Sequence, residues 1–282
     1  MASRTGIRAE VGLPQTPLTL EGASVLHQMA RVRWAEWKKL PAGERSAIAQ
    51  EFSQWLAPLE EEGTSALFTV LGHKADLMLI HFRDSFTGLK STELAMTNLR
   101  LCDYLEPTTT YVSVVELGLY DSSLKLYREL LEKGIEPNSP EWKAAIDETI
   151  ARQSEAMKSR LWPKIPASRY VSFYPMDRLR GEDKNFYKLP IEERQRQMEA
   201  HGLVGRRYAG KVQQIITGSI GFDDWEWGVD LFADDPLQFK KLIYEMRFDE
   251  VSAVYALFGQ FFVGVRCRAE RLGDLLAGRL PE

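Results

Sequence analysis

The residue types best suited to chemistry in this 282-residue chain gather in its last third. Tyr174 ends a strand-like run in "FYPMD", and Arg178 and Arg180 follow it in the same loop. Guanidinium groups bind carboxylates, so this loop could recognise an acidic ligand. The alternative is a half-buried strand tyrosine beside a solvated basic loop. His201, in "MEAHGL", is the other candidate, and its imidazole suits a metal ligand, a core position or a cation at a helix end.

The spacing around His201 predicts a helix over 190–202. Steps of three, four and three residues place Ile191, Arg194, Met198 and His201 near one face. Gly202 is a residue type that commonly ends a helix. No second histidine or cysteine lies nearby, so a local zinc site is not expected. A haem-type iron needs only one axial histidine, because the porphyrin supplies four nitrogens.

Other polar and aromatic residues in this part of the chain favour a pocket. Gln213 and Gln214 occupy adjacent strand positions, so one amide must face the core and needs a partner or a ligand. Trp225 and Trp227 are expected on one side of a strand, and Arg160 precedes "LWPKIP". A flat apolar macrocycle with carboxylate arms would suit such surroundings, although aromatic pairs more often pack in a core.

Composition excludes several classes of function. The formal net charge of −4 favours neither nucleic acid nor an anionic membrane as a partner. No apolar run approaches the roughly 18 residues of a membrane span. Cys102 and Cys267 lack metal or redox spacing and are expected to be reduced thiols of a cytoplasmic protein. Dinucleotide, phosphate-loop, nucleophile-elbow and zinc-protease motifs do not occur.

Hydrophobic periodicity predicts the same order of elements in both halves of the chain. The first half reads strand 23–32, helix 41–63, two strands within 65–82, helix 85–104 and strand 110–117. The second half reads strand 169–178, helix 190–202, a hairpin of 211–220 and 225–233, helix 235–248 and strand 255–265.

Each half therefore has the β-α-β-β-α-β order of a ferredoxin-like unit. We expect an α+β fold in which two such lobes pack sheet to sheet in a barrel-like arrangement. The expected divisions are a loose leader (1–21), an N-terminal lobe (22–118), a mostly helical connector (119–168), a C-terminal lobe (169–268) and a C-terminal tail (269–282).

Several stretches resemble the coproheme decarboxylases, which are chlorite dismutase-like enzymes of haem synthesis in Gram-positive and related bacteria. The resemblance rests on "YAGKVQQIITGSIGFDDWEWGV", "FYPMD", "MEAHGL", "LWPKIP" and "DEVSA", and it extends from about residue 22 onward. It implies a homopentamer whose subunits each hold a porphyrin in the C-terminal lobe. It also implies a cytoplasmic location and a transient contact with coproporphyrin ferrochelatase.

The resemblance further implies a reaction. Hydrogen peroxide would drive oxidative decarboxylation of two propionates of iron-coproporphyrin III to vinyls, which yields haem b. The iron porphyrin would be both substrate and redox centre, so the protein would mainly position it.

Matching motifs assign roles to residues of this chain. His201 would be the proximal iron ligand, and Tyr174 the catalytic tyrosine that becomes a radical and takes hydrogen from a propionate. Gln214 would face the side of the iron where peroxide binds. The positions that match substrate contacts are Arg160, Tyr174, Pro175, Met176, Asp177, Arg178, Gln214 and Ser252.

Two departures and three alternatives accompany this interpretation. Arg178 stands where the family often has Lys, and Phe186 where it often has Trp. A chlorite-splitting enzyme would carry a distal arginine at Gln214. A non-catalytic haem-binding protein would keep His201 without needing Tyr174, and an interaction module would bind no porphyrin.

Overall fold

The protein is described by a computed structural model that covers residues 12–280. Its strands form one antiparallel sheet, in the order β7–β6–β4–β1–β3–β2–β9–β5–β8, and β7 also pairs with β5, so the sheet closes into a barrel. The strands are β1 (Thr19–Val32), β2 (Ser65–Val70), β3 (Leu77–Arg83), β4 (Leu105–Gly118), β5 (Tyr170–Arg178), β6 (Gln213–Gly218), β7 (Trp227–Ala233), β8 (Ala256–Phe258) and β9 (Phe262–Arg266).

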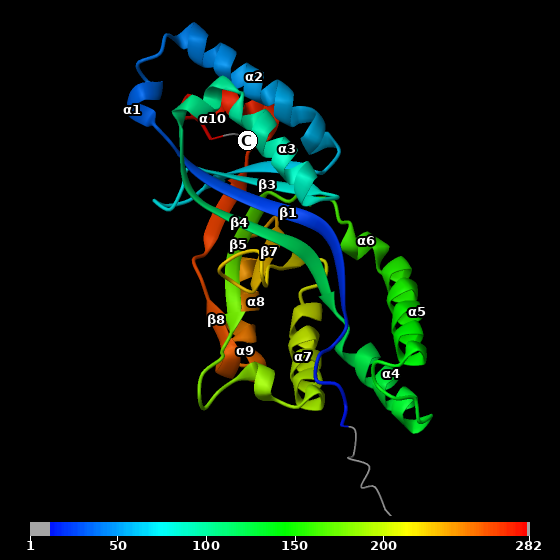
Figure 1. Ribbon diagram of the computed structural model, residues 1–282. Helices are drawn as coiled ribbons and strands as arrows, with labels where there is room; N and C mark the ends of the chain where they lie inside the picture. Colours follow the sequence, from blue (N-terminus) through cyan, green and yellow to red (C-terminus); the bar gives the residue numbers. More distant parts are fainter. Residues whose placement is uncertain (1–11, 281–282) are drawn as a thin grey trace, which may run out of the picture.

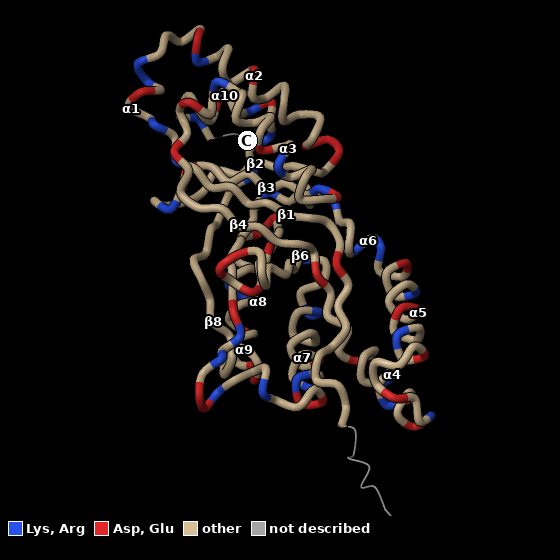
Figure 2. The backbone as a smooth tube through the Cα atoms, in the orientation of Figure 1, with Lys and Arg blue, Asp and Glu red and all other residues tan. Residues whose placement is uncertain are grey.

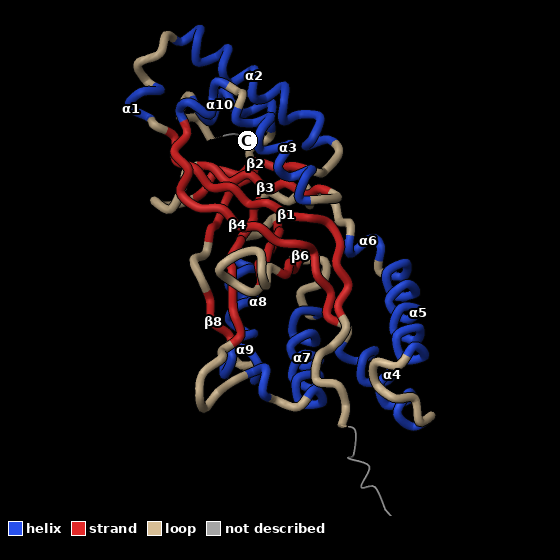
Figure 3. Tube along the Cα trace, viewed as in Figure 1, coloured by secondary structure: helices blue, strands red, loops and turns tan. Residues whose placement is uncertain are grey.

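The helices cover the outside of this barrel (Figures 1 and 3). In Figure 1, α2, α3 and α10 lie over the β1–β3 part of the sheet. Helices α7 to α9 lie along the strands that come from the second half of the chain, and α4 to α6 form an arm beside them. The helices are α1 (Trp34–Trp37), α2 (Ala42–Glu61), α3 (Phe86–Thr97), α4 (Tyr120–Glu132), α5 (Pro140–Ala156), α6 (Lys158–Leu161), α7 (Ile191–Arg206), α8 (Leu237–Met246), α9 (Glu250–Tyr255) and α10 (Leu272–Leu276). Within residues 12–280, no helix is both long and apolar enough to cross a membrane.

The α+β class and the two ferredoxin-like units are confirmed. Strands β4, β1, β3 and β2 come from the first half of the chain, and β6, β7, β5 and β9 come from the second. The structure adds that the two units share hydrogen bonds at both seams, between β2 and β9 and between β4 and β6. Pairing the edges satisfies backbone groups that two open sheets would leave exposed.

Strand alternation divides the second unit between two packing environments. Phe173 and Ile215 point into the barrel, where they meet Val25 and Phe68 of the first unit. On the outer face, Tyr174 packs with Met176, Val229 and Leu231 and with residues of α7 and α8. The predicted site lies in this outer layer, between the sheet and α7. Figure 2 shows that charged residues lie mainly on the helices and loops around it.

Two predicted boundaries in the C-terminal unit were wrong. Helix α7 continues past Gly202 to Arg206, because Gly202 does not adopt the positive φ with which a glycine commonly ends a helix. The predicted strand 255–265 is divided into the end of α9, β8 and β9. The break follows Gly259, where an added Cβ would lie 2.7 Å from Pro175.

Both ends of the described chain are also more tightly packed than the terms leader and tail imply. The predicted leader 1–21 lies partly outside the described residues, but its described part is not loose. The Tyr127 hydroxyl donates to the Thr16 carbonyl (2.9 Å), and strand β1 already begins at Thr19. In the C-terminal tail, α10 packs on α2, and Trp37 Nε1 donates to the Leu276 carbonyl (3.0 Å).

Candidate functional site

The imidazole of His201 is held by a carboxylate on a neighbouring helix. His201 Nδ1 lies 2.9 Å from Asp249 Oδ2, and Asp249 is the N-cap of α9, where its other oxygen accepts from the Ser252 backbone N–H (2.8 Å). Because Nδ1 is occupied, Nε2 is the ring nitrogen left for a metal. The His201 side chain is 24% exposed, so a ligand can reach it.

The environment of Asp249 favours its ionised form. Burial opposes ionisation, but hydrogen bonds from His201 and from the Ser252 backbone outweigh it, so the pKa of Asp249 is lowered. Ser252 adds its hydroxyl, which donates to Asp249 Oδ2 (3.2 Å). Ser252 therefore lies at the site but on the supporting side of His201.

Tyr174 lies on the outer face of β5, walled by aromatic rings. Its ring stacks on Phe261, with centroids 4.4 Å apart, and lies 5.6 Å from the ring of Phe258. Burial raises the pKa of Tyr174, although Arg247 and Arg178 oppose the shift. The phenol is therefore protonated at neutral pH, as a hydrogen donor must be. Across residues 12–280, no group is hydrogen-bonded to its hydroxyl.

Arg178 shares the outer face with Tyr174, four residues further along β5. The residue is only 7% exposed, and its Nη1 has no hydrogen-bond partner among the described residues. Nη2 contacts Met198 Sδ at 3.7 Å, and Met198 lies one turn before His201 on α7. Burial lowers the pKa of Arg178, because an uncompensated guanidinium in the interior is costly.

The predicted residues Tyr174, Met176, Arg178 and His201 are thus brought to one layer between β5 and α7. Gln214 joins them from β6. An added Cβ at Gly205, one turn beyond His201, would lie 3.3 Å from Gln214 Nε2. Gln214 is half-buried on the outer face of β6, against α7, whereas Gln213 is exposed, so neither amide faces the barrel core as was expected of one of them.

Three other predicted contacts lie elsewhere. Pro175 and Asp177 alternate to the opposite face of β5: Pro175 lines a cavity of about 880 Å³ at a barrel mouth, and Asp177 Oδ1 accepts from the Glu226 backbone N–H (2.8 Å). Arg160 lies on α6 with its side chain exposed. The structure does not place these three side chains beside Tyr174 and His201.

The aromatic expectations are partly corrected. Trp225 precedes β7 and packs against the barrel interior, whereas Trp227, within β7, packs on the outer layer. They do not share a side, because Trp225 lies in the hairpin turn and not in the strand. Phe186 is buried and lies under Arg178, with the guanidinium carbon 5.4 Å from the ring centre.

Two contributors were not indicated by the sequence patterns, and a third was indicated only in part. Asp249 is the partner of His201, and only its position before a short helix, with Ser252 three residues later, hints at a cap. Tyr120 opens α4, in a segment that periodicity assigns to an ordinary helix surface. Arg194 was expected on the same helix face as His201, two turns before it, but without a role.

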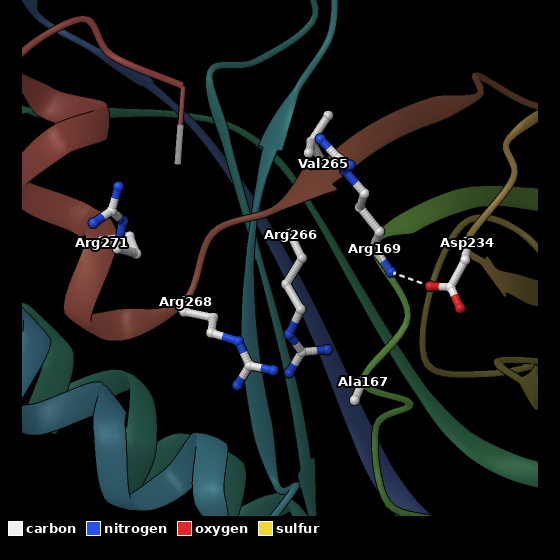
Figure 4. Close-up of a pocket in the computed structure, with 7 residues that line it drawn as sticks. All are labelled: Ala167, Arg169, Asp234, Val265, Arg266, Arg268 and Arg271. Carbon is white, nitrogen blue, oxygen red and sulfur yellow. Dashed lines mark hydrogen bonds between the residues drawn. The ribbon is translucent and has the colours of Figure 1, made fainter. Parts of the chain in front are cut away.

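A separate arginine-rich cavity lies away from this layer. It has a volume of about 470 Å³ and is bordered by Arg169, Arg266 and Arg268 (Figure 4). The Arg266 guanidinium is already bonded to Glu60 (3.2 Å) and to the Pro166 carbonyl (2.6 Å). None of the predicted site residues borders this cavity.

The residues present fit an iron porphyrin. Within the described part of the chain, no three His, Cys, Asp or Glu side chains form a metal site, so His201 suits an ion that brings its own ring of nitrogens. The unpartnered Arg178 Nη1 is suited to a carboxylate at the rim. The apolar side chains of the outer layer suit a flat macrocycle.

Comparisons with known proteins point in the same direction. A family model described as chlorite dismutase matches residues 45–267. A curated relative, the coproheme decarboxylase of Staphylococcus saprophyticus, is 42% identical over 270 residues, which cover 94% of this chain and all of the relative.

Solved structures show the same fold. A haem-binding protein from Thermus thermophilus aligns with a TM-score of 0.78 and 40% identity, over 94% of this chain and 99% of that one. A mutant chlorite dismutase from Candidatus Nitrospira defluvii aligns with a TM-score of 0.67 over 91% of this chain and 96% of that one. Its identity is 16%, so this second likeness concerns the fold alone.

Proposed function

This chain belongs to the chlorite dismutase family, and we propose that it is a coproheme decarboxylase. Its substrate is iron-coproporphyrin III, and its product is haem b. The observation that carries the proposal is one layer that combines a carboxylate-anchored His201, a buried protonated Tyr174 and a buried Arg178 with an unpartnered nitrogen.

The reaction that we propose uses hydrogen peroxide as the oxidant. Each propionate and one peroxide give a vinyl group, carbon dioxide and two waters, which balances atoms and electrons. The bound iron supplies the redox chemistry with peroxide. The protein would supply the imidazole of His201 as an iron ligand, exclude water from the aromatic layer and hold each carboxylate in place.

Tyr174 is the residue that we assign to the substrate C–H bond. Burial keeps its phenol protonated, so its proton leaves only together with an electron. The resulting tyrosyl oxygen takes hydrogen from the propionate β-carbon, and loss of carbon dioxide with a second electron leaves the vinyl group. Arg178, four residues further along the same face of β5, holds the carboxylate of that propionate.

The remaining assignments follow from position. His201 would hold the iron through Nε2, because its Nδ1 contacts Asp249, which also accepts from the Ser252 hydroxyl. We assign Met176 to the substrate wall, and Gln214 to the side where peroxide binds. Arg160, Pro175 and Asp177 are retained as substrate contacts only by resemblance, since their side chains lie outside the Tyr174 layer.

Decarboxylation and simple porphyrin binding are distinguished by one experiment. The protein and a Tyr174→Phe variant are loaded with iron-coproporphyrin III and titrated with hydrogen peroxide, and the porphyrin is followed by mass spectrometry. We expect loss of two carboxyl groups with the unaltered chain and none with the variant. Bleaching of the porphyrin without loss of carbon dioxide would instead indicate a haem-binding protein.

Chlorite splitting is tested in the same preparation. Gln214 is an amide and supplies no positive charge on the proposed peroxide side, which argues against chlorite as substrate. Oxygen release from chlorite by the haem-loaded protein, at a rate exceeding peroxide-driven decarboxylation, would reverse the assignment.

We also propose a homopentamer in the cytoplasm, which makes transient contact with coproporphyrin ferrochelatase. A pentamer of the 32.2 kDa chain would have a mass of about 161 kDa, five times the subunit mass. Native mass spectrometry of the loaded protein tests this number, and cross-linking with the purified ferrochelatase tests the contact.

A further inference from the structure

We infer that Arg194 is a second carboxylate anchor of the same site, specific for a propionate that the reaction retains. This inference rests on the proposed function for the identity of the ligand. No resemblance or comparison assigns a role to Arg194. The inference depends on the position of the Arg194 side chain and on its lack of an acidic partner among the described residues.

Arg194 lies on the face of α7 that carries the axial ligand. It precedes His201 by seven residues, nearly two full turns, so the two side chains leave the helix in almost the same direction. The helical rise separates them by roughly 10 Å along the axis. If His201 binds at the centre of the macrocycle, Arg194 therefore lies towards its rim.

Arg194 is a buried cation without an acidic partner. The residue is 4% exposed, its Nε has no hydrogen-bond partner, and across residues 12–280 no carboxylate lies within salt-bridge distance of it. Arg178 is likewise buried (7% exposed), its Nη1 has no hydrogen-bond partner, and no described carboxylate lies within salt-bridge distance of it. A buried, unpaired guanidinium is costly, and two in one layer are best explained by an anionic ligand that completes both.

Tyr120 shows that the two cations converge. Burial raises the pKa of Tyr120, and the charges of Arg194 and Arg178, with a hydrogen bond from Arg194, oppose the shift. Tyr120 therefore lies near a guanidinium of β5 and a guanidinium of α7. A carboxylate bound beside Tyr120 would be within the influence of both charges.

The two arginines are expected to hold different carboxylates. Arg178 lies on the same face of β5 as Tyr174, whereas Arg194 lies on α7, where its Nη2 donates to the Gln15 carbonyl. A carboxylate on Arg194 is therefore held away from the strand that carries the catalytic tyrosine. It belongs to one of the propionates that remain in haem b.

The connector and the N-terminal segment support this anchor. The Gln15 carbonyl accepts from Arg194 Nη2, and the Gln15 side chain accepts from the Ile191 backbone N–H (3.0 Å). Helix α4 fixes the same segment, since the Leu18 backbone N–H donates to Ser123 Oγ (2.8 Å). This gives the connector 119–168 a function, which is to hold Arg194 and Tyr120 at the rim.

The test compares Arg194→Gln with Arg196→Gln on the same helix. Arg196 is 57% exposed and pairs with Glu193 and Glu250, so it is a matched arginine outside the site. Full-length apoprotein is titrated without peroxide, by absorbance, with iron-coproporphyrin III, haem b and iron etioporphyrin. The last of these carries only alkyl groups at its rim.

We expect Arg194→Gln to weaken binding of iron-coproporphyrin III and haem b alike, roughly tenfold to a hundredfold, as for loss of a charged hydrogen bond. Iron etioporphyrin should bind within about twofold of the unaltered protein, and Arg196→Gln should bind all three normally. Equal weakening for all three ligands, or for none, would overturn the inference. Weakening for iron-coproporphyrin III alone would mean that Arg194 holds a reacting propionate.

Two further variants guard against a folding defect. If Arg194→Gln does not fold, Arg194→Lys keeps the charge and should show the same selective loss at smaller size. Tyr120→Phe should weaken both carboxylate porphyrins and not the alkyl one. Because no peroxide is present, a lack of decarboxylation would refute the proposed function without changing this binding pattern.

Discussion

At the scale of single residues, the site is defined by polar groups that the fold buries without full compensation. Arg178 and Arg194 lack acidic partners among the described residues, whereas Asp249 has several donors. A soluble domain normally pairs its buried charges. The unpaired guanidiniums therefore indicate where a ligand supplies the missing negative charge. The paired Asp249 indicates a contact that the protein itself holds fixed.

Asp249→Asn should weaken iron binding without unfolding the protein. Asparagine can still cap α9 through its carbonyl oxygen, but its amide cannot accept from His201 Nδ1 if that oxygen faces the helix. Loss of such a partner typically costs ten- to a hundredfold in metal affinity. Absorbance titration with iron-coproporphyrin III measures the loss, and Glu250→Gln, an exposed neighbour, is the control. Unchanged affinity would show that the His201–Asp249 contact does not orient the ligand.

His81 should make the protein sensitive to mild acid. It is fully buried, and burial, with the nearby charges of Arg83 and His27, lowers its pKa to about 3. Its Nδ1 accepts from Ser65 Oγ (2.8 Å), so the folded ring is neutral. Between about pH 6.5 and about pH 3 the unfolded chain binds a proton that the folded chain does not, so stability falls as pH falls.

His81→Gln should remove this dependence. Relative to the variant, the unaltered chain should lose about 2 kcal/mol of unfolding free energy between about pH 8 and about pH 5. Urea unfolding at the two pH values measures the difference. Parallel losses in both proteins would assign the acid sensitivity to other groups.

At the scale of elements, α7 is the part that assembles the site. One face carries Arg194, the proposed rim anchor, His201, the proposed iron ligand, and Gly205, which lies next to Gln214. The helix does not end at Gly202, so His201 lies inside regular structure. Its side chain is therefore fixed by the helix as well as by Asp249.

Two glycines of α7 should respond differently to alanine. Nothing lies within 4 Å of a Cβ at Gly202, so Gly202→Ala should stabilise the protein by about 0.5–1 kcal/mol through helix propensity. At Gly205 an added Cβ would lie 3.3 Å from Gln214 Nε2. Gly205→Ala should therefore stabilise the protein less than Gly202→Ala does, and it should slow turnover with peroxide. Thermal unfolding and initial rates measure both. Equal rates in the two variants would show that Gln214 does not depend on this contact.

At the scale of the whole molecule, the barrel makes the two lobes interdependent. Val25 and Phe68 of the first unit pack against Phe173 and Phe232 of the second within one core. The seams β2–β9 and β4–β6 add backbone hydrogen bonds between the units. Neither half can bury its inner sheet face alone.

The protein should therefore unfold in one transition. Calorimetry of the apoprotein is expected to show a single peak, and a fragment of residues 119–282 should lack cooperative unfolding, because its half of the core would be open to water. Two resolved peaks, or a fragment with a sharp transition, would show that the lobes are independent domains.

Local patterns in the sequence determined much of this protein. The repeated order of strands and helices specified the α+β class, because periodicity depends only on the residues within each element. The motifs containing Tyr174, His201 and Gln214 indicated the family and the chemistry. These features could be recognised from the sequence because each is encoded within a few consecutive residues.

The tertiary structure decided which of these residues meet. Strand pleating sent Tyr174 and Arg178 to the layer with α7 and sent Pro175 and Asp177 to the other face. Asp249 and Arg194 became part of the site only through the packing of α9 and of the N-terminal segment against α7. Such contacts join positions up to 179 residues apart, and short-range periodicity carries no information about them.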